Sequence, residues 1–327
     1  MRTAIALGVW IGVACSAPRQ PEAVALSRDP EASPSAQAGA APAQGALRVA
    51  ITLDDLGATP QSSELALSER ILSGLRASGA PVAVFANCQN LRSETLLLWQ
   101  RAGATVGNHT ATHLSLDAQG ADDVWWDDVK GCDEQLRSVL GQPVRFFRFP
   151  YLRYGKTPDS HAQAGQKLAS LGYAIAHVTA ATSEWLLAGY YDEALEKRDA
   201  ALRQELSTAY VDHMLESLQA ARDLALKRTG RDVAQITLAH VNQLAADHLP
   251  DVLQALRARG WQFISLQAAL ADPVYALPDV YVGGCGCSWL ARFEPPLTRD
   301  DTYVFGDYEA QLRERFEKRV KALSERR

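Results

Sequence analysis

Side chains that can bind a divalent metal and activate water are grouped at separate places along the sequence. Asp54 and Asp55 are adjacent, His109 and His113 lie four residues apart, and His240 stands far downstream. Two imidazoles at that spacing lie on one face of a helical turn. With one carboxylate they form a set of three ligands, which leaves a coordination position for water as a catalytic zinc site does. Each pair alone is common on protein surfaces, so only their combination indicates a catalytic metal site.

Short apolar segments before these polar groups predict strands, and amphipathic segments between them predict helices. The alternation predicts an α/β fold with a parallel sheet, either open or closed into a barrel. Active groups in such folds gather at the carboxyl ends of the strands, where the polar pairs stand. The predicted strands are Arg48–Leu53, Val82–Ala86, Thr105–Gly107, Arg145–Phe149, Ala174–Val178, Gln235–Ala239 and Gln262–Ser265. The predicted helices include Ser62–Ala77, Thr95–Ala102, Ala121–Leu140, Asp159–Leu171 and Leu249–Arg259.

Two parts of the chain depart from this regular alternation. The stretch Asp192–Lys227 is much longer than the other connections and predicts one or two helices, a helical excursion before the sixth strand. The stretch Gly283–Asp307 is rich in Gly, Pro and aromatic residues and predicts a loop. It is followed by Tyr308–Ser324, which predicts a charged amphipathic helix.

The N-terminal segment is typical of an exported protein. Arg2 and the apolar run over residues 4–11 predict a signal peptide, and the small residues around Cys15 resemble the processing site of a bacterial lipoprotein. An ordinary signal peptide with later cleavage is the alternative. We expect a signal over residues 1–15, a disordered Ala/Pro/Ser-rich tether over 16–46, a catalytic domain over 47–282 and a C-terminal extension over 283–327. The protein would then reside in the cell envelope, in the periplasm or at the outer membrane, or be secreted.

The composition excludes two classes of function. The 327 residues include 33 basic and 38 acidic side chains, and a formal charge of −5 argues against a nucleic-acid partner. No apolar run reaches the roughly 20 residues that span a bilayer, so we expect membrane contact only through a lipid on Cys15. The other cysteines are Cys88, Cys132, Cys285 and Cys287, and an oxidising compartment favours disulfides among them. Sequence alone leaves their pairing open.

Four ordered motifs resemble those of the polysaccharide deacetylases, which form carbohydrate esterase family 4 and share the NodB-homology domain. They read Thr52-Leu-Asp-Asp55, His109-Thr-Ala-Thr-His113, Arg148-Phe-Pro-Tyr151 and Leu238-Ala-His240, and the resemblance spans residues 47–270. It implies a distorted (β/α)₇ barrel, in accord with the seven predicted strands. It also implies an enzyme that removes acetyl groups from an acetylated polysaccharide.

The resemblance assigns roles to the residues at the matching positions. It implies that Asp55, His109 and His113 hold a divalent metal, which we expect to be zinc, with cobalt as the alternative. Asp54 would act as the general base. The cation of Arg148 would favour the ionised form of that base and hold its orientation. The alternative is that Arg148 forms an ion pair with only a structural role.

Further assignments concern the acetyl group and the sugar. Pro150 makes the chain turn rigidly, so that the amide of Tyr151 can face the oxyanion of the reaction. His240 would protonate the leaving nitrogen as general acid. Leu238, two residues earlier in the predicted strand, would wall a pocket for the acetyl methyl. Trp185 offers a flat apolar surface for a sugar ring, although an isolated tryptophan or leucine is more often part of the core.

One motif departs from the family pattern. The family usually has Asp-x-x-Asp-Trp where this chain reads Ala181-Thr-Ser-Glu184-Trp185. Trp185 is kept, Glu184 replaces one acid conservatively, and Ala181 removes the other. In the family, the acid that Ala181 replaces helps to set the protonation of the catalytic histidine. We therefore expect His240 to lack a carboxylate that stabilises its cation. The histidines that match no motif are expected to be structural: His161, His177, His213 and His248.

Three functions are compatible with these residues. The leading hypothesis is a metal-dependent deacetylase that acts on an N-acetylated glycan of the cell envelope, such as peptidoglycan, or on a chitin-like polymer. The second is an esterase that removes O-acetyl groups from a xylan-like glycan. The third is a glycan-binding lipoprotein without catalytic activity, with Ala181 as the first loss from its site.

Overall fold

The computed structural model of the chain describes residues 45–58, 61–118, 121–283, 286, 288–295, 297 and 299–325. They belong to one compact unit over Ala43–Arg327. The predicted signal segment with Cys15, nearly all of the predicted tether, and Cys285 and Cys287 lie outside the described residues. Among the helices that the structure describes, none is long and apolar enough to cross a membrane.

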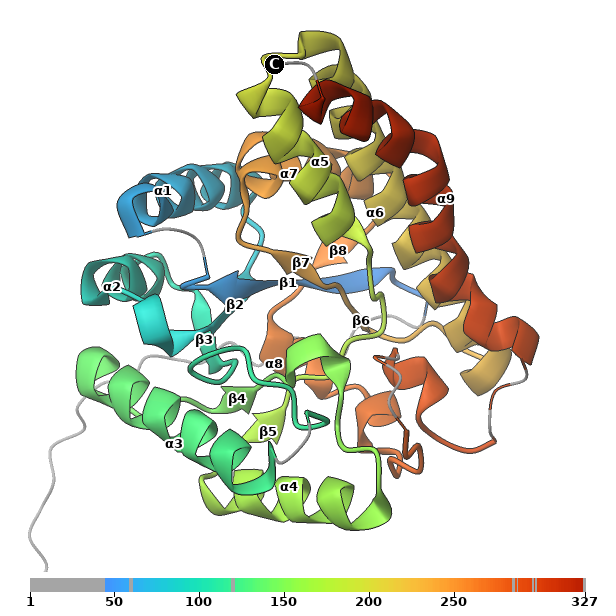
Figure 1. The fold of residues 1–327 in the computed structure, drawn as a ribbon. Coiled ribbons are helices and arrows are strands. Elements are labelled where there is room, and N and C mark those ends of the chain that lie inside the picture. The colour runs from blue at the N-terminus through green and yellow to red at the C-terminus, as the bar shows by residue number, and fades with distance from the viewer. Residues whose placement is uncertain are drawn as a thin grey trace, which may run out of the picture. The chain divides into compact units, whose positions relative to one another are not determined.

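Parallel strands form the sheet, and helices lie outside it (Figure 1). The order of the strands is β5-β4-β3-β2-β1-β6, and β7 and β8 also pair with β1. A parallel bridge between Ala180 and Thr237 joins the segment after β5 to the segment after β6, so the two ends of the row meet in a distorted barrel. The predicted α/β class is confirmed. The strands are β1 (Arg48–Leu56), β2 (Val82–Ala86), β3 (Thr105–Asn108), β4 (Phe146–Phe147), β5 (Ala174–Ile175), β6 (Gln235–Ile236), β7 (Ala239–His240) and β8 (Gln262–Phe263).

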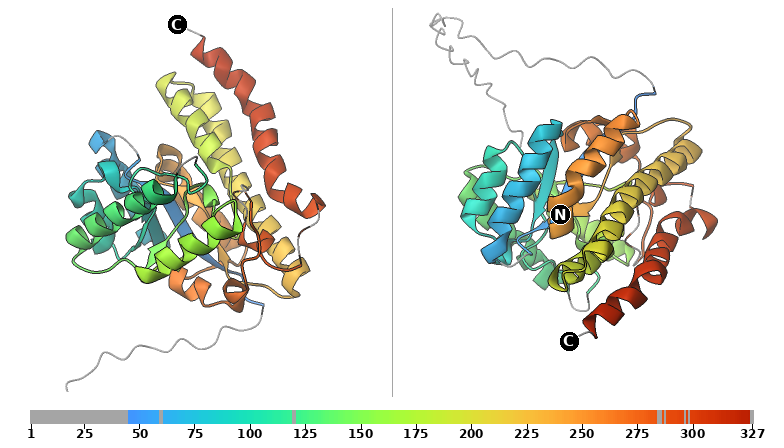
Figure 2. Two further views of the ribbon diagram at one scale, coloured as in Figure 1. Left: turned by 60° about the horizontal axis from the view of Figure 1, so that its bottom comes forward. Right: turned by 90° about the horizontal axis from the view of Figure 1, so that it is seen from above.

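The helices cover the barrel, and α5, α6 and α9 lie side by side on one flank (Figures 1 and 2). Their apolar faces share one buried core with the strands, in which the largest apolar side chains are tryptophans, a tyrosine and phenylalanines. The α-helices are α1 (Gln61–Ser78), α2 (Ser93–Arg101), α3 (Ala121–Leu140), α4 (Pro158–Ser170), α5 (Glu184–Glu196), α6 (Ala200–Thr229), α7 (Gln243–Ala258), α8 (Leu266–Leu270) and α9 (Arg299–Ser324). Short 3₁₀ helices are η1 (Cys88–Asn90), η2 (Pro150–Leu152), η3 (Pro273–Ala276) and η4 (Trp289–Ala291).

Local signals at the helix ends explain where α6 begins and ends and where α7 begins. The side chain of Asp199 accepts a hydrogen bond from the amide of Leu202 and starts α6, and Gly230 ends it with a left-handed φ of 69°. Asn242 caps α7 in the same way. Helix α6 ends shortly before β6, and α7 begins shortly after β7. The caps therefore set where these two helices stop and start relative to the last strands.

Four predicted elements differ clearly from the structure. The helix predicted over Leu249–Arg259 begins six residues earlier, at Gln243 of α7. The predicted sixth strand is divided into β6 and β7, because the amide of Leu238 between them donates to Ala180 instead of continuing the ladder with β1. The helical excursion consists of two helices and begins at Glu184, eight residues before the predicted start. The loop predicted to reach Asp307 is wrong over its last part, since α9 already begins at Arg299. The last prolines of the chain are Pro295 and Pro296, so every later residue can donate its amide to a helix.

One disulfide supports the loop that carries the paired histidines. Cys88 in η1 and Cys132 in α3 are bonded, with their Cα atoms 5.2 Å apart, which selects one of the pairings that the sequence left open. The amide of Cys88 donates to the carbonyl of Thr110, and the next amide donates to Ala111. The disulfide therefore ties α3 to the segment that holds the histidine loop in place.

We predict that the double variant Cys88→Ser/Cys132→Ser is less stable than the wild type by about 3–4 kcal/mol. The bond closes a loop of 44 residues. Without it the unfolded chain gains conformational entropy, which lowers the free energy of unfolding by about that amount. Denaturant unfolding of both proteins measures the difference. An unchanged midpoint in the variant would contradict the prediction, and a reduced wild type should behave like the variant.

Candidate functional site

The predicted site residues come together at the carboxyl ends of the strands. Asp54 and Asp55 lie near the end of β1, and His109 and Arg148 directly follow β3 and β4. The backbone register places Asp54 opposite His240 of β7. Because these strands are parallel, their ends meet at one rim of the barrel. The sequence motifs are thus brought to a single place.

Three ligand atoms of the predicted metal set converge. The Oδ1 atom of Asp55 lies 3.5 Å from Nε2 of His113 and 3.7 Å from Nε2 of His109. All three atoms lie within 4.8 Å of one another. Atoms bound at about 2.1 Å to one tetrahedral zinc would be roughly 3.4 Å apart, so the separations suit a shared ion.

The chemistry of the donor set also fits a metal. Asp55 Oδ1 is buried and has no hydrogen-bond partner among the described residues. His109 Nδ1 lies 2.8 Å from the carbonyl oxygen of Arg148, which can accept its proton and leave Nε2 free to bind. Burial lowers the pKa of His109 to about 3, so the ring is in the neutral form that metal binding requires.

The two histidines are brought together by a loop and not by a helical turn. Residues 109–113 are not helical, which contradicts the predicted turn, and the two rings are nevertheless 4.9 Å apart. Thr110 and His113 have φ values of 66° and 59°, and Asp55 and Tyr151 adopt 67° and 58°. Such left-handed backbone at residues other than glycine is strained and clusters at functional sites. Asn108 stabilises the loop, because its side-chain oxygen accepts from the amide of Thr110 at 2.8 Å.

The carboxylate of Asp54 is buried against a buried cation. Its Oδ1 accepts a hydrogen bond from Nη1 of Arg148 at 3.0 Å, and its Oδ2 lies 3.7 Å from Nε2 of His109. Arg148 is fully buried and also donates to Thr52 Oγ1 and to the carbonyl of Ala176. Burial raises the pKa of Asp54, and the nearby cation only partly offsets it. A carboxylate with a raised pKa beside the metal set is suited to accept a proton from water.

His240 has a carboxylate partner, contrary to the prediction drawn from Ala181. Its Nδ1 lies 2.6 Å from Oε1 of Glu184, which is completely buried at the first position of α5. The second oxygen of Glu184 accepts from the side-chain amide of Asn242 at 3.0 Å. Burial alone lowers the pKa of His240, but the charge and hydrogen bond of Glu184 outweigh it and raise the pKa to about 9. The prediction was wrong because Glu184 supplies the charge that Ala181 lacks.

Two exposed aromatic side chains contact or directly follow residues of the site. Tyr151 is 57% exposed, and its ring lies 4.4 Å from that of His113. Trp185 follows Glu184 on α5 and is 46% exposed, so it is not a core residue. Leu238 is largely buried between β6 and β7. Large exposed rings beside a polar site are suited to stacking against a sugar.

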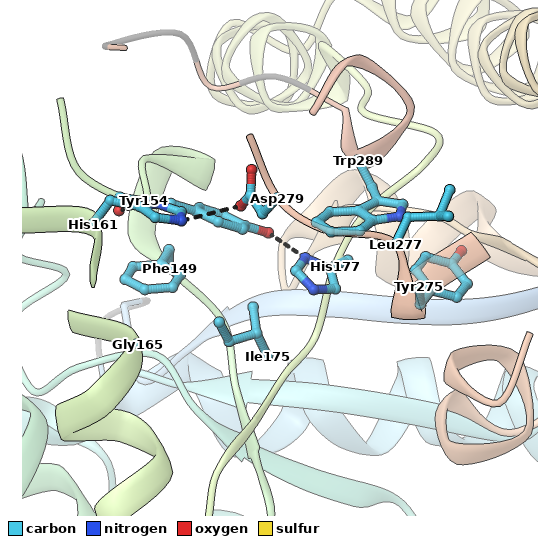
Figure 3. A pocket seen from close by; sticks show the side chains of 10 residues that line it. All are labelled: Phe149, Tyr154, His161, Gly165, Ile175, His177, Tyr275, Leu277, Asp279 and Trp289. Carbon is cyan, nitrogen blue, oxygen red and sulfur yellow. Dashed lines mark hydrogen bonds and ion pairs between the residues drawn. The ribbon is translucent and has the colours of Figure 1, made fainter. Parts of the chain in front are cut away.

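Residues between 275 and 289 in the C-terminal segment and the loop after β4 together line an aromatic cavity of about 200 Å³ (Figure 3). In it, the Tyr154 hydroxyl lies 3.2 Å from Nδ1 of His177, and Nε2 of His161 lies 3.7 Å from Asp279. Arg292 stacks 4.0 Å over the ring of Tyr154 and forms an ion pair with Asp279. His177 and His161 each have a polar partner in this cluster, which agrees with the structural role expected of both histidines.

The same segment approaches the site directly. A Cβ atom on Gly286 would lie 2.3 Å from the carbonyl oxygen of Tyr151, so only glycine allows this approach. The side chain of Ser288 donates to the carbonyl of Thr179 at 2.6 Å, on the segment after β5. This contribution could not be predicted from the sequence, since a Gly- and Pro-rich stretch carries no local signal for what it packs against.

Comparisons with known proteins agree with the motifs. Residues 42–174 match the family model described as polysaccharide deacetylase. That segment holds Asp54, Asp55 and the histidine pair, and it ends before Glu184 and His240. Among curated proteins, none matches the chain.

Several solved structures are similar to this chain. A family 4 carbohydrate esterase from Streptomyces lividans, in complex with acetate, is 19% identical, with 69% of this chain and 97% of that chain covered and a TM-score of 0.46. A peptidoglycan deacetylase from Bacillus subtilis is 17% identical, with 69% and 90% covered and a TM-score of 0.46. A polysaccharide deacetylase from Bacillus cereus is 16% identical, with 67% and 91% covered and a TM-score of 0.48.

We predict that Glu184→Gln lowers the pKa of His240 from about 9 towards or below the ordinary value for histidine. Loss of the carboxylate removes the charge that stabilises the imidazolium, so the ring loses its proton at lower pH. NMR titration of metal-free protein labelled at histidine measures this. Glu196→Gln, an exposed change on the same helix, is the control. A pKa that is the same in Glu184→Gln and wild type would contradict the role of the carboxylate.

Proposed function

The chain carries a polysaccharide deacetylase domain, to which residues 42–174 match, and from this premise we propose its reaction. The protein hydrolyses acetyl groups from an N-acetylated glycan of the cell envelope or from a chitin-like polymer. One observation supports this most strongly. The three ligand atoms of Asp55, His109 and His113 converge beside a buried carboxylate, Asp54, and an imidazole, His240.

In this proposal Asp55, His109 and His113 hold a divalent metal, zinc or cobalt. When bound, such an ion polarises the acetyl carbonyl and lowers the pKa of water from 15.7 towards about 7. The remaining residues do the rest of the chemistry. Asp54 accepts the proton of the attacking water, and its raised pKa makes it a stronger base than an exposed aspartate. Arg148 holds that carboxylate in one orientation through the hydrogen bond to Oδ1.

His240 acts as the general acid. An amine leaves a carbon centre only when it is protonated, and the Glu184 carboxylate keeps a proton on His240 at neutral pH. The backbone amide of Tyr151 stabilises the oxyanion, consistent with its strained turn after Pro150. Leu238 walls the acetyl pocket, and Trp185 stacks on a sugar ring.

Each segment of the chain has a role in this proposal. Residues 1–15 direct export, with acylation at Cys15, residues 16–46 form the tether, and residues 47–282 form the catalytic domain. The extension over 283–327 supports that domain, since Ser288 and Arg292 contact it. The protein would thus work in the bacterial envelope or outside the cell, where such glycans are found.

Acetate release from a panel of glycans tests the proposal. The panel contains N-acetylated peptidoglycan and chitin fragments and O-acetylated xylan, with zinc or cobalt supplied. We expect release from the N-acetylated members, its loss after chelation, and its return with metal. Release from xylan alone would indicate an O-acetyl esterase. Glycan binding without release would indicate a non-catalytic protein.

We predict that His109→Ala and Asp54→Asn fail in different ways. His109→Ala removes a ligand, so both metal retention and turnover should be lost. Asp54→Asn removes the base but no ligand, so the metal should stay while turnover falls about 10²–10⁴-fold. Metal content after dialysis and acetate release measure the two effects. Equal loss of metal in both variants would show that the two adjacent aspartates are assigned wrongly.

We also predict that His240→Ala separates amide from ester substrates. Hydrolysis of an acetylated amino-sugar oligomer should fall by about 10²–10⁴-fold, because its amine needs a proton to leave. Hydrolysis of an activated aryl acetate should fall much less, since its leaving group needs none. The measurement is kcat/KM for both substrates in variant and wild type. Equal losses would mean that His240 positions the substrate or the metal set instead.

A further inference from the structure

A buried histidine from the helical excursion contacts the start of the helix that carries Glu184. His213 lies in the middle of α6 and is 3% exposed. Its Nε2 accepts a hydrogen bond from the backbone amide of Ser183 at 2.8 Å. Because an amide nitrogen can only donate, this Nε2 carries no proton and the ring is the neutral Nδ1–H tautomer.

Ser183 depends on this contact. It is the residue before α5, and its side chain makes no capping hydrogen bond. An amide at a buried helix start that finds no acceptor costs free energy, so the usual solution is a local side chain. Here the acceptor comes from a different helix. Burial keeps the pKa of His213 at about 4, so the acceptor persists at neutral pH.

Glu184 follows Ser183 directly, and its position is critical. Its two oxygens bridge His240 and Asn242 at 2.6 and 3.0 Å. On the other side, the hydroxyl of Thr182 donates to the carbonyl of Leu238 at 2.6 Å. The segment over residues 182–184 is therefore fixed at one side by the strand region of the barrel and at the other by α6.

We propose that His213 is a positioning residue for the acid of the reaction. It holds the amide of Ser183, which places the Glu184 carboxylate against Nδ1 of His240. Helix α6 lies wholly beyond residues 42–174, so this support comes from a part of the chain outside the family match. The two helices of the excursion then have distinct roles, since α5 supplies the carboxylate and α6 sets its place. The effect on turnover rests on the proposed function.

Three variants test the proposal in the zinc-loaded protein. His213→Leu removes the acceptor and keeps a buried side chain. His213→Gln places an amide oxygen near the position of Nε2 and restores an acceptor. Leu218→Ala creates a cavity in the same helix, five residues beyond His213, and controls for general loss of stability. Melting temperatures show how much each change destabilises the fold.

Two readouts are compared. The first is the proton NMR signal of the imidazole Nδ1–H of His240, which needs no activity. The second is the ratio of kcat/KM for an acetylated amino-sugar oligomer to that for an aryl acetate. We expect His213→Leu to shift or broaden the signal and to lower the ratio by about 10-fold to 100-fold. His213→Gln should recover most of both, and Leu218→Ala should change neither.

Two results would overturn the proposal. One is a wild-type signal and ratio in His213→Leu. The other is a change of equal size in Leu218→Ala, which would make the effect a general loss of stability. Failure of the proposed function looks different. The wild type would then release no acetate from any glycan, whereas the NMR signal would still decide whether His213 places Glu184.

Discussion

The buried residue Arg148 connects β1, the segment after β5 and the histidine loop, on which the site depends. Its Nη1 donates to Asp54 and Thr52 of β1, its Nε donates to the carbonyl of Ala176 after β5, and its own carbonyl lies 2.8 Å from Nδ1 of His109. One residue thereby orients the proposed base and one proposed metal ligand. A buried charge that loses its partner costs about 3–5 kcal/mol, so the strands on either side are held to one relative position.

The parallel barrel and its additions both position the site. The strands bring the carboxylates and His109 to one rim, and the disulfide at Cys88 holds the histidine loop from outside. Two parts of the chain that depart from the regular barrel also reach the site. The helical excursion supplies Glu184, and the C-terminal segment packs against Tyr151 through Gly286. The helical excursion and the C-terminal segment therefore both contribute residues to the site or to its support.

The sequence predicted most of what local patterns determine. Alternating apolar runs located the strands, and α3 was predicted with both ends correct, because periodicity and polar boundaries are local properties. The convergence of Asp55 with His109 was predictable, since parallel strand ends must meet. The partner of His240 was not. Its identity depends on where α5 begins, and an acid at Glu184 reaches Nδ1 only from the first turn of that helix. Packing of the C-terminal segment left no local signal either.

Zinc X-ray absorption of the purified, metal-loaded protein would examine the proposed metal centre without relying on turnover. We expect one zinc per chain, bound by two imidazole nitrogens and by oxygen at about 2.0–2.2 Å. Those ligands are the ones expected from His109, His113 and Asp55, whose ligand atoms lie within 4.8 Å of one another. A spectrum with sulfur ligands, with a single imidazole, or with less than one tightly held zinc per chain would contradict this metal centre.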